Sequence, residues 1–563
     1  QRDVRSPGKR LVAFLANRSA ALAVMWVAMA MTLSSPRHSL WLFMVALAAF
    51  AAYASQTMGL GLPLRLPKIA ARKDPGSPKP GRKSFERAAG ILYLGNDAES
   101  GQEMWIDQRD MLTHCLVLGT TGSGKTQALI SMAYNALAMG SGIFYIDPKS
   151  SSELPLRIWQ LARFLGRDDD FRLLNYGTDN GRATGRLSNT NNPFSFGSAD
   201  ALTQLLGSLM PPSHDGSNSI FADKGLSLIS ALLYCLVDLR EQGLLPLSVS
   251  TIRDYLAPEA CVRLLSHKSL GDSSKASLKA ALHNCNWVEG KSLESQNSFF
   301  EQYGYAQSYF GRALSSLTDT YGHIYGSERG EVDFKDVVLN RRILVTLLPS
   351  MEKSPAELAS LGKITLSAIR TAASVGLGST VEGRETDVMG SLPIHFKGTC
   401  PFLSVVDEYA AIVTPGFEIL LTQGRGLGLA TVVASQDYAG LIEADRKGAQ
   451  QIAANTTMKI FMKSDDPERT YGLLRGLTGE APVMRTTGYE LSPGSLMGGE
   501  WRDNQGATVQ VLPRTDFLDL TSHLEGEAHC VFRGKLIRAR MFYANPATKG
   551  AVTRVHRFLQ LES

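Results

Sequence analysis

The feature that most limits the possible folds is the stretch GTTGSGKT at Gly119–Thr126, which matches G-x-x-x-x-G-K-[ST] without a gap. An apolar run typical of a buried strand, Cys115–Gly119, precedes it, and a run typical of a helix, Thr126–Met139, follows it. This strand–loop–helix order is the one that a phosphate-binding loop requires. An ordinary glycine-rich turn would not need that order, so the sequence favours a nucleotide-binding α/β fold.

The residue types in this loop suit a bound triphosphate. Gly122 and Gly124 let the backbone curl until several N–H groups face one anion, and the following helix adds the positive end of its dipole. Lys125 is expected to reach the β- and γ-phosphates, and Thr126 to ligate Mg²⁺. The predicted ATP-binding residues are Gly119, Thr120, Thr121, Gly122, Ser123, Gly124, Lys125 and Thr126.

Continuous apolar runs predict the rest of the sheet, because strands covered on both faces are hydrophobic throughout. The predicted strands are Cys115–Gly119, Gly142–Asp147, Arg342–Leu348, Phe402–Asp407, Ala430–Ser435, Thr457–Met462 and Ala528–Phe532. We expect residues 89–200 and 326–545 to form this α/β domain. Between 201 and 325 the strand pattern vanishes, which predicts an all-helical insert. Residues 480–515, rich in Gly, Pro and Thr, are expected to be loop-like.

Two uncharged apolar stretches, about 19–34 and 40–62, open the chain and predict a pair of transmembrane helices. A signal peptide with a core helix, or two buried helices, are the alternatives. Basic residues lie in 1–18 and again in the Pro- and Lys-rich stretch 63–88, which we expect to be a tether. Only Arg37 lies between the two stretches, so positive-inside reasoning places both ends in the cytoplasm. The first residue is Gln1, which indicates that the native N-terminus is missing, and residues 546–563 form a C-terminal segment.

Composition narrows the function only slightly. The net charge of +5 on 563 residues permits contact with nucleic acid or anionic lipid but does not demand it. The six scattered cysteines form no CxxC pair, which indicates reduced thiols in a cytosolic compartment. The ten histidines have no ligand spacing, so no metal site made by protein side chains alone is expected.

A second motif ends the strand Phe402–Asp407, where two carboxylates, Asp407 and Glu408, follow the apolar run. This pattern is weak alone but has the form of a Walker B strand when a phosphate-binding loop is present. Asp407 would hold Mg²⁺ through water, and Glu408 would polarise the attacking water. The predicted metal-binding residues are therefore Thr126 and Asp407.

Further candidates follow in the chain. Arg425 precedes the next strand and can act on a neighbouring subunit's phosphate, or can simply form a surface salt bridge. Gln436 ends that strand and can sense the γ-phosphate, or can make an ordinary strand-end hydrogen bond. Asp147-Pro148-Lys149 lies beside the nucleotide in such sheets, although an exposed turn explains it equally well. The aromatic run from Tyr303 to Phe310 could stack on bases, but helix packing is the favoured interpretation.

In this order, these features resemble the type IV secretion coupling proteins, and among them the DotL-type branch, which includes the IncI-plasmid TrbC coupling proteins. The resemblance covers roughly residues 90–545. The stretches that carry it are THCLVLGTTGSGKT (113–126), SNTNNPF (188–194), SLTDTYGHI (316–324), EVDFKDVVLNRRILVTLLP (331–349), EKSPAELASLGKI (352–364), and VVDEY (405–409) to SQD (435–437).

The resemblance implies a RecA-like ATPase that forms a homohexamer at the inner membrane of a bacterium. It would receive a relaxase bound to single-stranded DNA, or protein substrates, and pass them to the channel components of a type IV secretion system. In this interpretation Lys125, Asp407, Glu408, Arg425 and Gln436 are catalytic. DotL-type proteins carry a long C-terminal tail that docks adaptors, whereas this chain stops at Ser563, so we expect conjugative DNA transfer. The alternatives are an FtsK/HerA-like DNA translocase and a receptor scaffold in which nucleotide only sets conformation.

Overall fold

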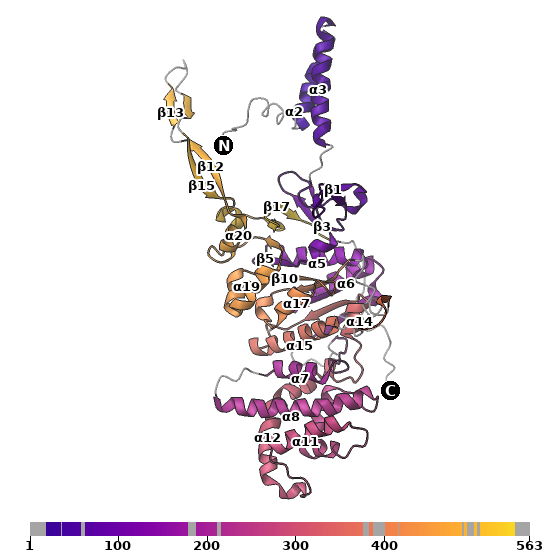
Figure 1. Ribbon diagram of the computed structural model, residues 1–563. Coiled ribbons are helices and arrows are strands. Elements are labelled where there is room, and N and C mark those ends of the chain that lie inside the picture. Colours follow the sequence, from indigo (N-terminus) through magenta and orange to yellow (C-terminus); the bar gives the residue numbers. More distant parts are fainter. Residues whose placement is uncertain are drawn as a thin grey trace.

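A large mixed sheet organises the fold of the computed structural model (Figure 1). The structure describes residues 18–34, 36–57, 62–177, 187–210, 216–374, 382–386, 400–414, 416–486, 489–492, 500–503 and 507–545. The order of the eleven strands is β4-β3-β17-β16-β11-β5-β10-β9-β6-β8-β7. Neighbours from β11 to β7 pair in parallel, and those from β11 to β4 pair antiparallel.

The parallel part contains the strands that continuous hydrophobicity predicted. They are β11 (Met458–Phe461), β5 (Cys115–Leu118), β10 (Leu429–Ser435), β9 (Phe402–Val406), β6 (Ile143–Asp147) and β8 (Ile343–Leu347), and every residue in them is buried. The remaining strands are β7 (Phe171–Asn175), β16 (Glu527–Phe532), β17 (Lys535–Met541), β3 (Leu92–Asp97) and β4 (Glu103–Ile106). Of these five, only β16 was predicted from the sequence, because the others are partly exposed.

Helices cover both faces of this sheet, and side chains alternate between two apolar clusters. Along β5, Leu116 and Leu118 enter one cluster, and Cys115 and Val117 enter the other. The second cluster includes α5 (Lys125–Ala138) and α6 (Glu153–Phe164). The first includes α15 (Pro355–Ser374), α17 (Phe417–Gln423) and α19 (Arg446–Asn455). This two-sided cover explains the continuous apolar runs.

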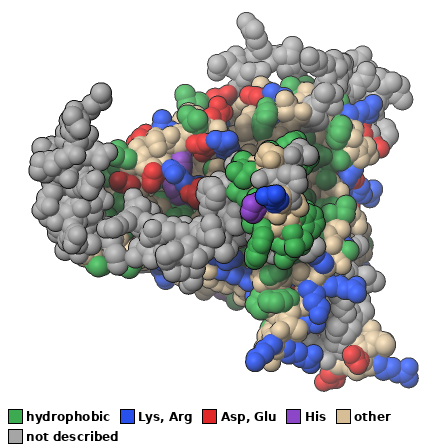
Figure 2. Space-filling model, turned by 90° about the horizontal axis from the view of Figure 1, so that it is seen from above, with side chains coloured by type: hydrophobic (Ala, Val, Ile, Leu, Met, Phe, Trp, Pro, Cys, Tyr) green, Lys and Arg blue, Asp and Glu red, His purple; other side chains and the backbone are tan. Residues whose placement is uncertain are grey.

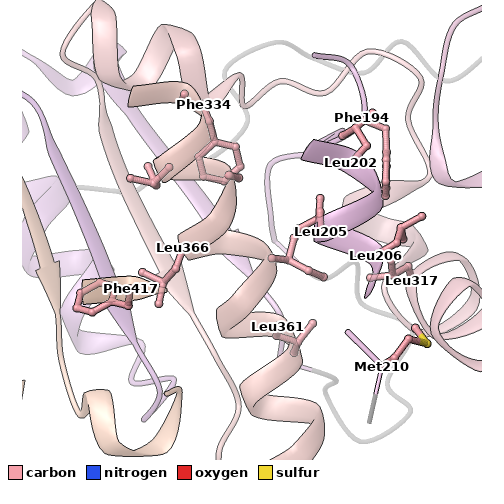
Figure 3. Packing of buried hydrophobic residues seen from close by; sticks show 14 of the residues in the cluster. Phe194, Leu202, Leu205, Leu206, Met210, Leu317, Phe334, Leu361, Leu366 and Phe417 are labelled. Carbon is pink, nitrogen blue, oxygen red and sulfur yellow. The ribbon is translucent and has the colours of Figure 1, made fainter. Parts of the chain in front are cut away.

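The described elements from Ala199 to Tyr325 are all helical, as the missing strand pattern predicted. They are α7 (Ala199–Ser208), α8 (Gly216–Glu241), α9 (Val249–Tyr255), α10 (Pro258–Leu264), α11 (Asp272–Asn284), the 3₁₀ turn Leu293–Ser295, α12 (Asn297–Ser315), the π-helical turn Ser316–Thr320 and α13 (Gly322–Tyr325). Leu202, Leu205 and Leu206 of α7 project into the core near Leu361 of α15, which joins this insert to the sheet (Figure 3).

Buried hydrogen bonds hold the insert together and fix its border with the sheet. Tyr303 and Phe310 are buried in helix packing, and the Tyr303 hydroxyl donates to the Leu256 carbonyl at 3.0 Å, so these two rings cannot stack on bases. At the insert's border, Asn192 donates to the carbonyls of Leu247 and Glu328, both at 2.8 Å. A buried amide that is fully used in this way fixes where the insert leaves the sheet.

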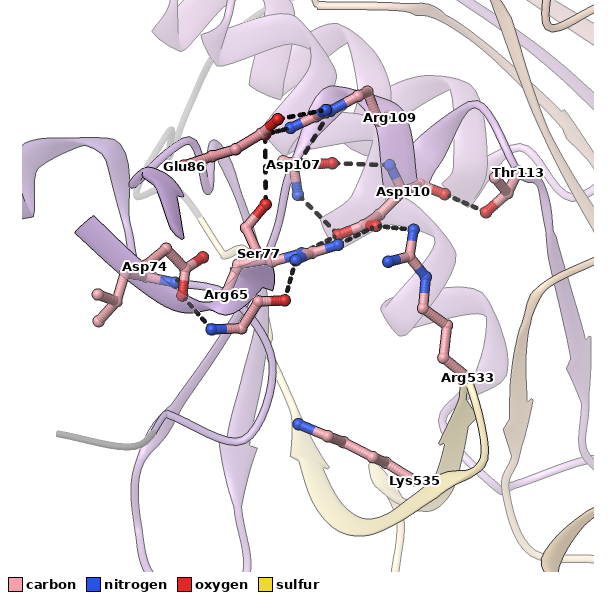
Figure 4. Close-up of polar contacts among 12 residues, drawn as sticks. Arg65, Asp74, Ser77, Glu86, Asp107, Arg109, Asp110, Thr113, Arg533 and Lys535 are labelled. Atoms are coloured by element: carbon pink, nitrogen blue, oxygen red, sulfur yellow. Dashed lines mark hydrogen bonds and ion pairs between the residues drawn. The ribbon is translucent and has the colours of Figure 1, made fainter. Parts of the chain in front are cut away.

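The expectation that residues 63–88 form a free tether is wrong. They fold onto the edge of the sheet as β1 (Lys73–Pro78), β2 (Phe85–Arg87) and a 3₁₀ turn, Lys68–Ala70. Arg65 donates two hydrogen bonds to the Asp110 carboxylate, at 2.7 and 2.9 Å, and Arg533 contacts it at 3.1 Å (Figure 4). Asp110 lies in α4 (Gln108–Met111), directly before β5. Local basic composition cannot reveal that one arginine has a buried partner 45 residues away.

The prediction of a loop over residues 480–515 is also wrong. Glu480–Thr486 (β12) and Ala507–Pro513 (β15) form an antiparallel ribbon, which continues into the pair Tyr489–Ser492 (β13) and Glu500–Asp503 (β14). The ribbon stands away from the sheet (Figure 1). Because it is outside the hydrophobic core, its strands lack the apolar runs that made the buried strands predictable.

Two helices lie side by side at the N-terminal end, α2 (Arg18–Ser34) and α3 (Ser39–Thr57) (Figure 1). Among the described residues, no helix combines the length and the apolarity needed to cross a membrane. Many large apolar side chains on the pair are exposed, including Trp26 and Trp41, which are 69% and 76% exposed. Seen from above, apolar side chains gather over this protrusion (Figure 2). Residues 1–17 of the predicted N-terminal segment 1–18, and the whole of the predicted C-terminal segment 546–563, lie outside the described residues.

Candidate nucleotide-binding site

The sequence motifs meet at the carboxyl edge of three neighbouring parallel strands. The loop Gly119–Thr126 follows β5, Gln436 follows β10, and Asp407 and Glu408 follow β9. The backbone N–H of Gly119 donates to the Ser435 carbonyl at 3.2 Å. The sheet therefore brings together residues that lie more than 300 positions apart, at the edge where open α/β sheets bind ligands.

The loop has the backbone conformation that phosphate binding needs. Gly122 and Gly124 have φ angles of 80° and 85°, in the left-handed region that favours glycine. A Cβ on Gly124 would lie 2.8 Å from the Gly526 nitrogen, so no larger residue fits there. The Gly526 N–H donates to the Ser123 carbonyl at 2.9 Å, which holds the loop from the antiparallel side of the sheet.

An unused donor in the loop supports an anionic ligand. Within the described part of the chain, the buried hydroxyl of Ser123 has no hydrogen-bond partner. Lys125 begins α5, and its side chain is only 4% exposed. A helix N-terminus, a lysine and a free hydroxyl at one place match the donor set that a nucleotide phosphate requires.

The two predicted motifs touch through ion pairs. The Lys125 ammonium lies 2.6 Å from Glu408 Oε1 and 3.5 Å from Asp407 Oδ1. A second lysine, Lys149, lies 2.9 Å from the same Glu408 oxygen. Lys149 belongs to the turn that the sequence could not separate from an ordinary exposed turn, so its role at the site was missed.

The electrostatics of this cluster depend on burial and on the two lysines. Burial acts to raise the pKa of Glu408, but Lys125 and Lys149 outweigh it and hold the pKa below its ordinary value. Burial, with the nearby Asp407 carboxylate, raises the pKa of Asp147 to about 6. Asp147 therefore keeps its proton up to about pH 6, where Glu408 is already ionised.

Mg²⁺ fits this site only together with a nucleotide. Within the described ranges, no three His, Cys, Asp or Glu residues form a group that could hold a metal ion. The sequence predicts one hydroxyl ligand, from Thr126, and one carboxylate ligand, from Asp407. Mg²⁺ is usually bound by one or two protein oxygens together with substrate phosphates. The donor chemistry agrees with the sequence prediction for these two residues, whose roles stay predictions.

Arg425 is far from the site of its own chain. It lies exposed in the turn between α17 and β10, before the amino end of β10. The seven residues of β10 separate it from the carboxyl edge, a distance of roughly 20 Å at about 3.3 Å per residue. Any action on a phosphate must therefore be on a neighbouring subunit. Gln436, in contrast, is exposed at the carboxyl edge beside the loop.

A loop on the antiparallel side of the sheet supports the site, and it was not predicted from the sequence. Glu525 and Gly526 pack against Gly124, between α21 (Phe517–Thr521) and β16. His523, two residues earlier, contacts His529 with 2.7 Å between Nε2 and Nδ1, and burial lowers the pKa of His529 to about 4. No motif predicts this support, because it arises from strand pairing rather than from local spacing.

Comparison with known proteins adds three kinds of likeness. The chain is 38% identical over 527 residues to the type 4 coupling protein DotL of Legionella pneumophila, covering 90% of this chain and 67% of that protein. Residues 401–521 match the family model described as the TraM recognition site of TraD and TraG. Residues 79–155 match the FtsK/SpoIIIE family model.

Solved structures of the bacterial conjugative coupling protein TrwB share the fold. The unbound form has a TM-score of 0.52 at 16% identity and covers 81% of this chain and 91% of that one. The TrwB complex with ADP and Mg²⁺ has a TM-score of 0.51 at 15% identity, with the same coverage. The predicted α/β fold of a P-loop ATPase is thereby confirmed, and its large sheet is mixed. The two transmembrane helices of the same prediction are not supported among the described residues.

Proposed function

This chain belongs to the family of type IV coupling proteins, and we propose that it hydrolyses ATP to drive substrates into a type IV secretion channel. The observation that carries this proposal is the contact of Lys125 with Asp407 and Glu408 at the carboxyl edge of the sheet. These are the residues that binding and hydrolysis require, and they meet although 283 positions separate Lys125 from Glu408.

The chemistry of each residue at the site suggests its role in hydrolysis. Mg²⁺ bound with the nucleotide supplies positive charge that offsets the charge developing on the phosphates. The Lys125 ammonium and the N–H groups at the start of α5 bind the phosphates. Asp407 would hold Mg²⁺ through water, and Glu408 orients the attacking water. Gln436 lies at the same edge, where its amide can contact the γ-phosphate.

Arg425 extends the proposal to a ring. Because it lies on the edge opposite its own loop, we propose that it completes the site of a neighbouring subunit in a homohexamer. Mixing tests this directly. Arg425→Ala and Glu408→Gln chains should each be inactive alone, whereas mixed rings contain some sites with both intact residues and should regain partial turnover. Continued inactivity of mixed rings would refute the shared site.

We also propose that the helix pair α2–α3 holds the chain at the bacterial inner membrane, with both ends and the ATPase domain in the cytoplasm. Its exposed tryptophans and the basic residues that flank it in sequence support this. Flotation of the full chain with lipid vesicles tests the anchor, since a chain lacking residues 1–62 should lose flotation. Equal flotation of both chains would refute it.

The most specific part of the proposal is the identity of the transported substrate. We propose a relaxase bound to single-stranded DNA, because the chain shares its fold with a conjugative coupling protein. Protein effectors are the alternative, because DotL is the identified relative in sequence. Affinity purification of the full chain from membranes distinguishes the two. Recovery of a relaxase supports DNA transfer, and recovery of adaptor proteins alone contradicts it.

Two other functions predict different results. An FtsK/HerA-like translocase should move along DNA without any secretion partner, so stable co-purification with channel components would count against it. A nucleotide-gated scaffold should support transfer without turnover. Lys125→Ala removes the phosphate-binding ammonium, and loss of both hydrolysis and transfer is the result that our proposal predicts.

A further inference from the structure

The turn after β6 is fixed in position by several hydrogen bonds. The Lys149 N–H donates to Asp147 Oδ1 at 3.0 Å. Outside the turn, the Leu348 N–H donates to the Asp147 carbonyl at 2.9 Å, and the Ser350 N–H donates to the Pro148 carbonyl at 3.0 Å. Lys149 is therefore not on a free surface loop. Its backbone is held on one side by its own turn and on the other by the residues that follow β8.

This turn faces the catalytic carboxylates because β6 and β9 are neighbours. Ile146 pairs with Val406, and the Asp407 N–H donates to the Ile146 carbonyl at 3.1 Å. The Lys149 side chain reaches from the turn to Glu408 Oε1 at 2.9 Å, while its own exposed fraction is 41%. The Glu408 side chain is only 12% exposed, so the contact joins a largely buried carboxylate to a partly exposed lysine.

Binding of ATP should change which charged side chains in this cluster pair with one another. Two ammonium groups, Lys125 and Lys149, face two carboxylates, Asp407 and Glu408, and both lysines contact the same oxygen of Glu408. Binding of phosphates requires Lys125, and binding of Mg²⁺ requires Asp407. Lys149 is then the cation that remains to pair with Glu408. Without it, a largely buried carboxylate would lose its partner, which is costly.

Nothing else that the structure describes orients this carboxylate. Among the described residues, the contacts of its oxygens are with the two lysines. The backbone of Glu408 adopts the left-handed conformation, with φ of 44° and ψ of 49°, which is uncommon for a residue with a side chain. Its backbone N–H donates to Asp407 Oδ1 at 2.9 Å, and its carbonyl accepts from the Ala411 N–H at 2.9 Å. These bonds hold the main chain but do not orient the side chain.

We propose that Lys149 is a positioning residue for ATP hydrolysis, holding the Glu408 carboxylate in place when Lys125 turns to the nucleotide phosphates. This inference rests on the proposed function, since it presumes hydrolysis at this site. Lys149 need not contact the nucleotide. It acts through Glu408, so its loss should impair turnover without impairing nucleotide binding.

The split between turnover and nucleotide binding gives a readout that mere loss of structure would not move. A generally disrupted site should lose analogue affinity and turnover together. Loss of the Lys149 ammonium removes only one of the two lysines that contact Glu408 Oε1, and it leaves Lys125 and the loop Gly119–Thr126 unchanged. It should therefore lower kcat while KM and analogue affinity stay close to their wild-type values.

The experiment compares full-length wild-type, Lys149→Met and Lys149→Arg chains for hydrolysis and for binding of a non-hydrolysable ATP analogue. We expect Lys149→Met to lower kcat by at least about tenfold and to change KM and analogue affinity by less than about threefold. Lys149→Arg, which keeps the charge, should recover most of the turnover. In a Glu408→Gln background, Lys149→Met should have no further effect.

A matched control is Lys279→Met on the insert. Lys279 is 42% exposed and pairs with Glu289 at 2.5 Å, so it resembles Lys149 in exposure and contact but lies far from the site in sequence and fold. The Lys279→Met variant should hydrolyse ATP at the wild-type rate. Normal kcat in Lys149→Met, or an equal loss of analogue binding, would overturn the inference alone. Absence of hydrolysis by the wild-type chain would overturn the proposed function and this inference with it.

Discussion

The buried carboxyl group of Asp147 should make the stability of the nucleotide-free chain depend on pH, and Asp147→Asn tests this. Asp147 is 4% exposed, and its pKa is raised from 3.8 to about 6, chiefly by burial. The folded state therefore retains the proton to a higher pH than the unfolded state does. A stabilising contribution that is complete below pH 4 is lost as pH rises through about 6.

The magnitude follows from the gap between these two pKa values. At about 1.4 kcal/mol per pH unit, the contribution lost above pH 7 is about 3 kcal/mol. Asparagine carries no charge but keeps the carbonyl oxygen that accepts from the Lys149 N–H. Asp147→Asn should thus be more stable than the wild type at pH 7.5 by up to about 3 kcal/mol, and by about half of that at pH 5.0.

Thermal unfolding of wild-type and Asp147→Asn chains without nucleotide, at pH 7.5 and at pH 5.0, measures this difference. A change of 1 kcal/mol shifts Tm by about 2–4 °C in a domain of 150–250 residues and by less in a larger one. Asp465→Asn, at an exposed position, is the control and should shift Tm at neither pH. A variant that is less stable at pH 7.5, or a gain that is equal at both pH values, would refute the reasoning.

Three further predictions concern other parts of the structure. Asp110→Asn should lower the free energy of unfolding by about 3–5 kcal/mol, because it leaves Arg65 buried without its carboxylate partner. The double variant Arg65→Met with Asp110→Leu should lose clearly less stability. Equal losses for the two variants in thermal unfolding would contradict this. Arg425→Ala should abolish hydrolysis but keep ATP binding, and either lost binding or unchanged turnover would overturn its assignment. Gly124→Ala should abolish binding of a fluorescent ATP analogue, because its Cβ would lie 2.8 Å from the Gly526 nitrogen; retained binding would show that the loop need not be this tight.

The parts of the fold that could be predicted are those in which one local pattern has one structural cause. Strand β9 is buried on both faces, and its sequence is an unbroken apolar run. The motif at Gly119–Thr126 is rarely found outside phosphate-binding loops. Edge strands such as β7 and β17 are partly exposed, so their composition does not differ enough from that of loops. In the ribbon of β12 and β15, none of the side chains whose burial is described is buried, so no apolar pattern is imposed on them.

The parts that could not be predicted depend on partners distant in sequence. Arg65 looks like one more basic residue of a tether until the structure places Asp110 beside it. Lys149 looks like an exposed turn residue until β6 lies next to β9 and brings it to Glu408. Spacing along the chain carries no information about such pairs. The sequence could name the motif residues that the structure brings to this edge, but it could not predict the contacts among them, and the roles of these residues stay predictions.

The most direct test of the account is to measure hydrolysis and substrate transfer together in cells and membranes that carry Glu408→Gln. This variant retains Lys125 and the whole loop Gly119–Thr126, so it should bind ATP as the wild type does. The account predicts that transfer falls in proportion to hydrolysis, with both reduced by at least about a hundredfold. Transfer at the wild-type level with hydrolysis abolished would contradict the claim that this site powers transport.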